Sequence, residues 1–181
     1  KRDQINLTIV GRRGQKNNAI NSLGSVSLSL LNDLKSDVFI IPSRAKYKAI
    51  KKVGFASTCQ KDDPYNIWKT KEIFQRDDVE FEYIHIANEN NASHAKANIE
   101  KVASYCKENL SNTKVEFSTI KSDLIAESLV SFTLDKKLDA LVLFHRKKGV
   151  FHKLFANSTA KEVIKISENP ILVLKGDKNH L

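Results

Sequence analysis

The strongest constraint on this chain is an internal repeat, because residues 5–41 align without a gap to residues 138–174. The offset between the two segments is 133 residues (138 − 5). Identical residues are few, but the apolar pattern agrees along the whole length: LTIV falls on ALVL, and VFII falls on ILVL. An offset of this size matches the length of one small α/β domain. Because an overlooked repeat leads to a wrong fold assignment, the repeat sets the domain organisation first.

The repeat predicts two unequal domains. Residues 1–45 are expected to be the last third of a first copy, a strand–loop–helix–strand remnant, and residues 46–181 a complete second copy. The front of the first copy would then lie outside these 181 residues. With six Gly and three Pro in the whole chain, no segment has the composition of a flexible linker.

The second copy has the pattern of alternating strands and helices. Short apolar runs predict five strands, at residues 51–57, 81–87, 115–120, 140–144 and 171–174. Helical spacing predicts a helix that opens at Asp63-Pro64 and a longer one over residues 92–110. It also predicts a helix capped by Ser122-Asp123 and running through Leu138, and a last one over residues 153–167. We therefore expect an α/β fold: an open, parallel, Rossmann-like sheet of five strands with helices on both faces, plus the remnant of a second such domain.

A glycine-rich segment follows the first strand of the first copy. Gly11 and Gly14 are followed, after nine residues, by Gly24-Ser25, where a helix is expected to begin. Glycine lets the backbone pass close to a phosphate, and the N–H groups of a helix N-terminus favour anions. Arg12 and Arg13 can add positive charge. The segment has the chemistry of a phosphate-binding loop, and an ordinary tight turn at Gly11 and Gly14 is the alternative.

A strand followed by Gly-x2-Gly-x9-Gly-Ser resembles the nucleotide-binding motif of the universal stress protein family. The order of strands and helices resembles this family over nearly all 181 residues, and its members often occur as tandem copies. The resemblance implies that the intact protein binds ATP, with or without Mg, and takes part in the stress response. It assigns the ATP phosphates and ribose to these residues: Gly11, Arg13, Gly14, Gly24 and Ser25.

The second copy departs from the family motif at every glycine. The matching positions are Phe144, Lys147 and Asn157-Ser158, and Thr58 stands where the family usually places an Asp near the adenosine. The resemblance therefore implies that the second copy holds a degenerate site and serves as a structural and dimerisation partner.

Members of the family commonly associate through their last strands. The resemblance implies that two segments pair antiparallel, in an intramolecular pseudo-dimer or a homodimer: Val38, Phe39, Ile40 and Ile41 with Ile171, Leu172, Val173 and Leu174.

The charge of the chain supports an alternative function. Thirty Lys+Arg against 21 Asp+Glu give a net charge of +9, and His145-Arg146-Lys147-Lys148 lies in the degenerate loop. A nucleotide-independent scaffold could dock acidic partners or nucleic acid through this loop, whereas the simpler interpretation is a solvated basic loop. Nucleic acid is the less favoured partner, because no aromatic residues are interleaved with the basic ones.

Other function classes find little support in the sequence. No apolar run reaches the roughly 20 residues of a membrane span, no signal peptide is recognisable, and two Cys favour a reducing compartment, so we expect a cytoplasmic protein. The five His form no metal set, and no paired carboxylates indicate an enzyme. Slow ATP hydrolysis stays open without a candidate base, and Cys59 is a candidate reactive thiol.

Overall fold

The computed structural model of the chain describes residues 5–12, 29, 31, 36–46, 48–57, 59, 63–74, 78–87, 92–110, 112–145 and 159–175. The chain divides into two units: Lys1–Tyr47 with Leu143–Leu181 form unit 1, and Lys48–Val142 form unit 2. The fold class is α/β with mostly parallel strands. Among the described residues, no helix has the length and apolarity that crossing a membrane would require.

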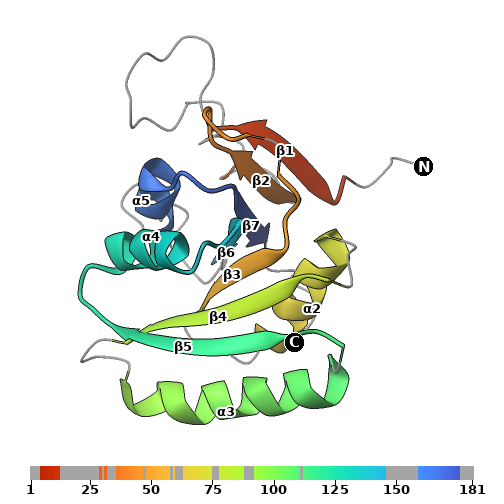
Figure 1. The fold of residues 1–181 in the computed structure, drawn as a ribbon, viewed down its shortest axis with the longest axis vertical. Coiled ribbons are helices and arrows are strands. Elements are labelled where there is room, and N and C mark those ends of the chain that lie inside the picture. Colours follow the sequence, from red (N-terminus) through yellow and green to blue (C-terminus); the bar gives the residue numbers. More distant parts are fainter. Residues whose placement is uncertain are drawn as a thin grey trace. The chain divides into compact units, whose positions relative to one another are not determined.

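Unit 2 is built on parallel strands in the order β6-β3-β4-β5 (Figure 1). These strands are β3 (Lys52–Ser57), β4 (Glu80–Ala87), β5 (Val115–Lys121) and the beginning of β6 (Ala140–His145). The connecting helices are α2 (Asp63–Phe74), α3 (Ala92–Asn109) and α4 (Ile125–Asp135). β4 is buried along nearly its whole length, as expected of a strand with neighbours on both sides and helices over its faces.

The two faces of the unit 2 strands pack differently. On one face, the rings of Phe55, Tyr83 and Phe117 contact one another across three strands, with centroids 5.9 and 5.2 Å apart. On the other face, Gly54 lets side chains approach the backbone, since a Cβ there would lie 2.8 Å from Leu138 Cδ1. A larger residue at position 54 would therefore disturb the core.

Unit 1 contains β1 (Leu7–Gly11), β2 (Asp37–Ile41), α5 (Thr159–Ile166) and β7 (Ile171–Lys175). β1 pairs with β2 in parallel, and β2 pairs with β7 antiparallel. All five residues of β7 are buried, and the first four form the unbroken apolar run ILVL.

The predicted α/β fold class is confirmed, and each of the five strands predicted for residues 46–181 is present within one residue of its expected bounds. The predicted boundary between residues 45 and 46 stays a prediction. The remnant's predicted helix lies almost entirely outside the described residues, as does the predicted start of the last helix at residue 153.

The helix predicted from Ser122-Asp123 through Leu138 is shorter at both ends. It begins at Ile125 and ends at Asp135, with Leu124 at the N-cap and no side-chain capping bond. The Ser122 hydroxyl instead accepts the Leu124 N–H over 3.0 Å, so it stabilises a turn before the helix. At the other end, Lys137 takes a left-handed conformation (φ 54°), which stops the helix before Leu138.

Candidate functional site

The glycine motif begins where β1 ends. Gly11 is the last residue of β1 and is exposed, and the next residue donates its backbone N–H to the Ile41 carbonyl over 2.8 Å. Four predicted ligand residues lie outside the described residues: Arg13, Gly14, Gly24 and Ser25. The role of the motif in binding phosphate therefore stays a prediction.

The Arg12 side chain does not have the position that the sequence suggested. Its guanidinium is buried and donates from one nitrogen to the carbonyls of Ile164 (3.3 Å), Lys165 (3.1 Å) and Ser167. These carbonyls lie at the C-terminal end of α5, where the helix dipole is negative and carbonyl groups lack helical partners. Arg12 thus caps a helix, and its positive charge is stabilised by the negative end of the helix dipole.

The degenerate loop of the second copy is described at one position. Phe144 lies in β6 and is partly buried. Lys147, Asn157 and Ser158 lie outside the described residues, as does Thr58 after β3. The inference of a degenerate second site therefore still rests on the sequence.

The structure brings the two predicted pairing segments together. β2 and β7 pair antiparallel within unit 1, with Val38 opposite Val173, Phe39 opposite Leu172 and Ile40 opposite Ile171. Val38 and the β7 residues are almost completely buried. Whether two complete domains associate through these strands stays a prediction.

Buried polar groups reinforce the β2–β7 pair. Asp37 accepts the Lys175 backbone N–H over 2.8 Å, and the Lys175 ammonium donates to the Leu31 carbonyl. Asp37 and Lys175 are 4% and 3% exposed. Buried polar groups are tolerated where hydrogen bonds replace water, so these contacts fix the register of the pair.

A cluster of hydroxyl and carboxylate groups that the sequence did not predict lies at the carboxyl end of β3. The Ser57 hydroxyl donates to Asp63, the first residue of α2, and accepts the Cys59 N–H over 2.7 Å. The Tyr83 hydroxyl directs its one hydrogen toward Asp63 (2.7 Å) and Ser57 (2.9 Å). We call Ser57, Asp63 and Tyr83 the hydroxyl cluster.

Two residues extend the hydroxyl cluster along the same edge. His85 is 1% exposed, and its Nδ1 lies 3.2 Å from the Ser57 carbonyl oxygen. A carbonyl can only accept, so Nδ1 carries the hydrogen, and Nε2 of a neutral ring is then a bare acceptor. No described residue supplies a partner to Nε2. Asn98 of α3 donates to the Cys59 carbonyl over 2.9 Å.

The electrostatics of this cluster suppress ionisation of its acidic protons. Burial raises the pKa of Tyr83, and the nearby Asp63 charge raises it further. Burial also raises the pKa of Cys59, a hydrogen bond from Tyr83 lowers it, and the Asp63 charge raises it; the net shift is upward. Since the thiolate is the nucleophile, Cys59 is poorly suited to be the reactive thiol suggested by the sequence.

The hydroxyl cluster shapes the turn that follows β3. Cys59 adopts a left-handed conformation (φ 57°), and hydrogen bonds hold both its N–H and its C=O. In open α/β sheets, ligands bind outside the carboxyl ends of the strands, and β3 ends at this turn. Ser57 and Asp63 are six residues apart, but Tyr83 comes from another strand, β4. The one feature of the sequence that could have indicated the cluster is the presence of polar side chains within the apolar run FEYIHIA.

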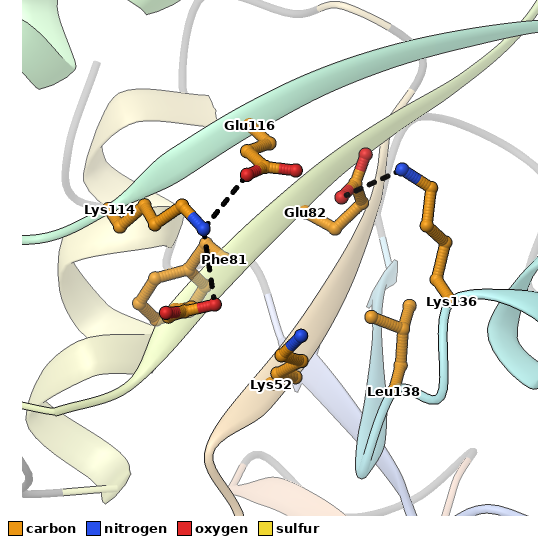
Figure 2. Close-up of a pocket in the computed structure, with 8 residues that line it drawn as sticks. Lys52, Phe81, Glu82, Lys114, Glu116, Lys136 and Leu138 are labelled. Atoms are coloured by element: carbon orange, nitrogen blue, oxygen red, sulfur yellow. Dashed lines mark hydrogen bonds and ion pairs between the residues drawn. The ribbon is translucent and has the colours of Figure 1, made fainter.

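A second polar region lies at the opposite, amino-terminal ends of the strands. Figure 2 shows a hollow in which Lys114 faces Glu116 and Lys136 faces Glu82, at 2.9 and 3.8 Å. The Lys114 ammonium also lies 3.5 Å from the Glu80 carboxylate. With Lys52, the hollow has three Lys and three Glu, so its formal charges cancel. A hollow with equal numbers of Lys and Glu lacks the net positive charge that favours a nucleotide phosphate.

No protein-family model and no curated protein sequence matches this chain. Several solved structures match this chain. A universal stress protein from Archaeoglobus fulgidus DSM 4304 is 19% identical with a TM-score of 0.70, and the match covers 97% of this chain and 62% of that one. The chain thus spans less than two thirds of the length of that structure.

Two shorter structures match over nearly their whole length. A universal stress protein in complex with cAMP is 15% identical (TM-score 0.56), with 71% of this chain and 98% of that chain covered. Another universal stress protein from Archaeoglobus fulgidus is 16% identical (TM-score 0.53), with 68% and 97% covered. At these identities the likeness concerns the fold, and the fold of this chain is that of universal stress proteins.

Proposed function

We propose that this chain is part of a tandem universal stress protein that binds adenine nucleotide and regulates a stress response without catalysing a reaction. ATP would bind at the glycine motif of the first copy, through Gly11, Arg13, Gly14, Gly24 and Ser25. The second copy would support that site from within the same protein.

The observation that carries this proposal is the match of 97% of the chain to 62% of a longer universal stress protein. Shorter structures of the same fold match about 70% of the chain over nearly their own full length. This combination is what a remnant joined to one complete copy would give. The cAMP complex of one such structure supports an adenine nucleotide as the ligand class.

The position of Gly11 is compatible with the proposed site. Gly11 ends a parallel strand and is exposed, and parallel strands of this fold class present their ligands at that end. The antiparallel β2–β7 pair supports an association of the two copies through their last strands. Cytoplasmic location and homodimer formation belong to the same proposal.

Thermal unfolding of the full-length protein with added ATP tests the proposal. A ligand that binds the native state stabilises it by about 2.7 kcal/mol at 100 times its Kd. We expect ATP to raise the melting temperature, and cAMP to serve as a comparison within the same chemical class. An unchanged melting temperature at millimolar ATP would contradict nucleotide binding.

The alternative scaffold function makes a different prediction. The net charge of +9 favours binding of an acidic partner, and such binding falls steeply with salt. The scaffold function is favoured if ATP leaves the melting temperature unchanged and the protein binds a polyanion such as heparin. The affinity for heparin should then be lost between 50 and 200 mM salt, because binding releases counterions.

A further inference from the structure

Two buried cations connect the first copy to the last helix and the last strand of the second copy. The Arg12 guanidinium donates to carbonyls at the end of α5, among them the carbonyl of Ile164. The Lys175 ammonium, at the end of β7, donates to the carbonyl of Leu31, a buried residue in helical conformation. Arg12 is 9% exposed and Lys175 is 3% exposed. Because a buried charge is stable only where hydrogen bonds replace water, these carbonyls help to hold both side chains in place.

The two acceptors are equivalent positions of the internal repeat. Leu31 and Ile164 differ by the repeat offset (164 − 31 = 133). In each copy, the carbonyl at this position therefore accepts a hydrogen bond from a buried cation of the other copy, Arg12 in one case and Lys175 in the other. The contacts between the copies are thus reciprocal.

The two donors, in contrast, are not repeated. His145 stands at the position equivalent to Arg12, and Pro42 stands at the position equivalent to Lys175. Proline has no side-chain donor, so the first copy cannot make the contact that Lys175 makes. The pair of contacts is therefore particular to this combination of two copies and does not follow from the shared fold alone.

The glycine motif lies, in the sequence, between the two contacts. Arg12 directly follows Gly11, and Leu31 comes seven residues after Gly24 (31 − 24 = 7). Both of these flanking residues are attached to residues 164–175 of the second copy. A binding site whose groups are held in their bound arrangement before the ligand arrives gains affinity, because less ordering accompanies binding. The second copy is thus placed to influence the affinity of the motif.

We propose that Lys175 is a positioning residue for the glycine motif, and that through Leu31 it raises the nucleotide affinity of the first copy from within the second. This inference rests on the nucleotide function proposed above and names a residue that regulates that site. Arg12 acts on the other flank of the motif, through α5. Because coupling between two sites is reciprocal, a nucleotide bound at the motif strengthens both contacts in turn.

The ATP affinity of Lys175 variants in the full-length protein tests the proposal. Lys175→Met keeps much of the side-chain length and removes the donor, and Lys175→Arg restores a cation. We expect Lys175→Met to weaken ATP binding in calorimetry by about 10-fold, and Lys175→Arg to recover most of the affinity. Lys107→Met, at an exposed position in the last turn of α3, removes the same charge elsewhere and should leave the affinity unchanged.

Val173→Thr separates positioning from a general loss of stability. Val173 lies opposite Val38 in the same strand pair, so its replacement weakens that pair without removing the Lys175 donor. All variants are compared at a temperature at which they are folded. We expect Lys175→Met to bind ATP clearly more weakly than Val173→Thr. Equal losses of affinity at a comparable loss of melting temperature would overturn the proposal, because Lys175 would then act through stability alone.

The carbonyl ¹³C resonance of Leu31 reports the contact without any nucleotide. In the 181-residue chain, Lys175→Met should shift this resonance, since the carbonyl loses a donor, and Lys107→Met should not. An unshifted resonance in the Lys175→Met variant would mean that the contact is absent in solution, and the proposal would be wrong.

Reciprocal coupling gives a readout in the second copy. The Ser167 N–H donates to the Val163 carbonyl at the end of α5, over 2.9 Å. We expect ATP to slow hydrogen exchange of the Ser167 amide in the full-length protein, because a strengthened contact opposes local opening. Exchange that ATP leaves unchanged would contradict the coupling.

The outcomes distinguish this inference from the function on which it rests. If the wild-type protein does not bind ATP, the proposed nucleotide function fails, and the positioning role fails with it. If the wild type binds ATP and Lys175→Met binds it as tightly, the nucleotide function stands and the positioning role alone is refuted.

Discussion

Arg12 and Lys165 are 153 residues apart in the sequence, yet the Arg12 guanidinium donates to the Lys165 carbonyl over 3.1 Å. The same nitrogen reaches Ile164 and Ser167, so one side chain from the end of β1 closes the C-terminal end of α5. Since β2 pairs with both β1 and β7, unit 1 is held together by strand pairing and by this cap. The beginning of the glycine motif, at Arg12, is therefore fixed to the last helix.

We expect Arg12→Ala to destabilise the protein by about 2 kcal/mol, because hydrogen bonds to a charged donor are worth about 1.5–3 kcal/mol. Arg12→Lys should lose less, since it keeps the positive charge at the helix end. Urea unfolding measures both. Arg44→Ala, at an exposed turn, is the matched control and should change little. Equal stability of the Arg12→Ala and Arg44→Ala variants would show that the cap is unimportant.

Val173→Asp is expected to disrupt the β2–β7 pair. Val173 is 1% exposed and lies opposite Val38, so the new carboxylate would be buried without a partner. Such a change costs about 3 kcal/mol or more. Val173→Thr, with nearly the same shape, should lower the melting temperature by less, which keeps the test informative if the Asp variant does not fold. Leu124→Asp, at a 65% exposed position, is the control. An unchanged melting temperature and oligomeric state of Val173→Asp would count against the pairing.

Tyr83→Phe removes the hydroxyl that donates to Asp63 and Ser57 inside the hydroxyl cluster. We expect a loss of about 1–3 kcal/mol, the cost of leaving a buried acceptor without its donor. Tyr105→Phe, at a 38% exposed position, should be nearly neutral. A double-mutant cycle with Asp63→Asn would then show a coupling energy of about 0.5–3 kcal/mol, and additive effects would mean that the contact has no energetic weight.

Asp139 should make the stability of unit 2 sensitive to acid. Burial opposes its ionisation, but the Lys48 ammonium and the backbone N–H groups of Lys51 and Lys52, at 2.9 Å each, hold the pKa of Asp139 below its ordinary value of 3.8. A lowered folded-state pKa gives stability that is present above pH 3.8 and is lost as the pH falls through the folded value.

Unfolding measured from pH 7 to pH 2.5 checks this expectation. Asp139→Asn should be less stable than the wild type at pH 7, and the difference should shrink as the pH falls below about 4. Asp123→Asn, at an exposed position, is the control and should follow the wild type. A stability difference that is constant over the whole range would contradict the ionic role of Asp139.

Much of the fold could be predicted because its strands are local apolar runs. ALVLF and ILVL form β6 and β7, and the resemblance to universal stress proteins implied the antiparallel partner of the latter. Contacts between distant segments could not be predicted. Nothing near Gly11 in the sequence indicates that the Arg12 side chain reaches a helix end 152 residues away.

The hydroxyl cluster escaped sequence analysis for a similar reason. Asp63 was recognised as a helix start, but the Tyr83 hydroxyl that reaches it comes from a strand 20 residues later. Asp63 lies in the first turn of α2, and the hydrogen bond from Tyr83 links that turn to β4. The direction of a side chain at the end of a strand depends on contacts with distant residues, whereas the strand itself is indicated by its local apolar pattern.

Calorimetric titration of ATP into the full-length protein, and into two variants at positions related by the repeat, shows whether the first copy holds the nucleotide. Gly24 and Asn157 differ by the 133-residue offset, so Gly24→Val and Asn157→Val place the same side chain in the two copies. We expect Gly24→Val to abolish ATP binding, because Val blocks the close approach of backbone and phosphate, and Asn157→Val to leave it unchanged. Absence of binding to the wild type, or equal loss in both variants, would contradict this expectation.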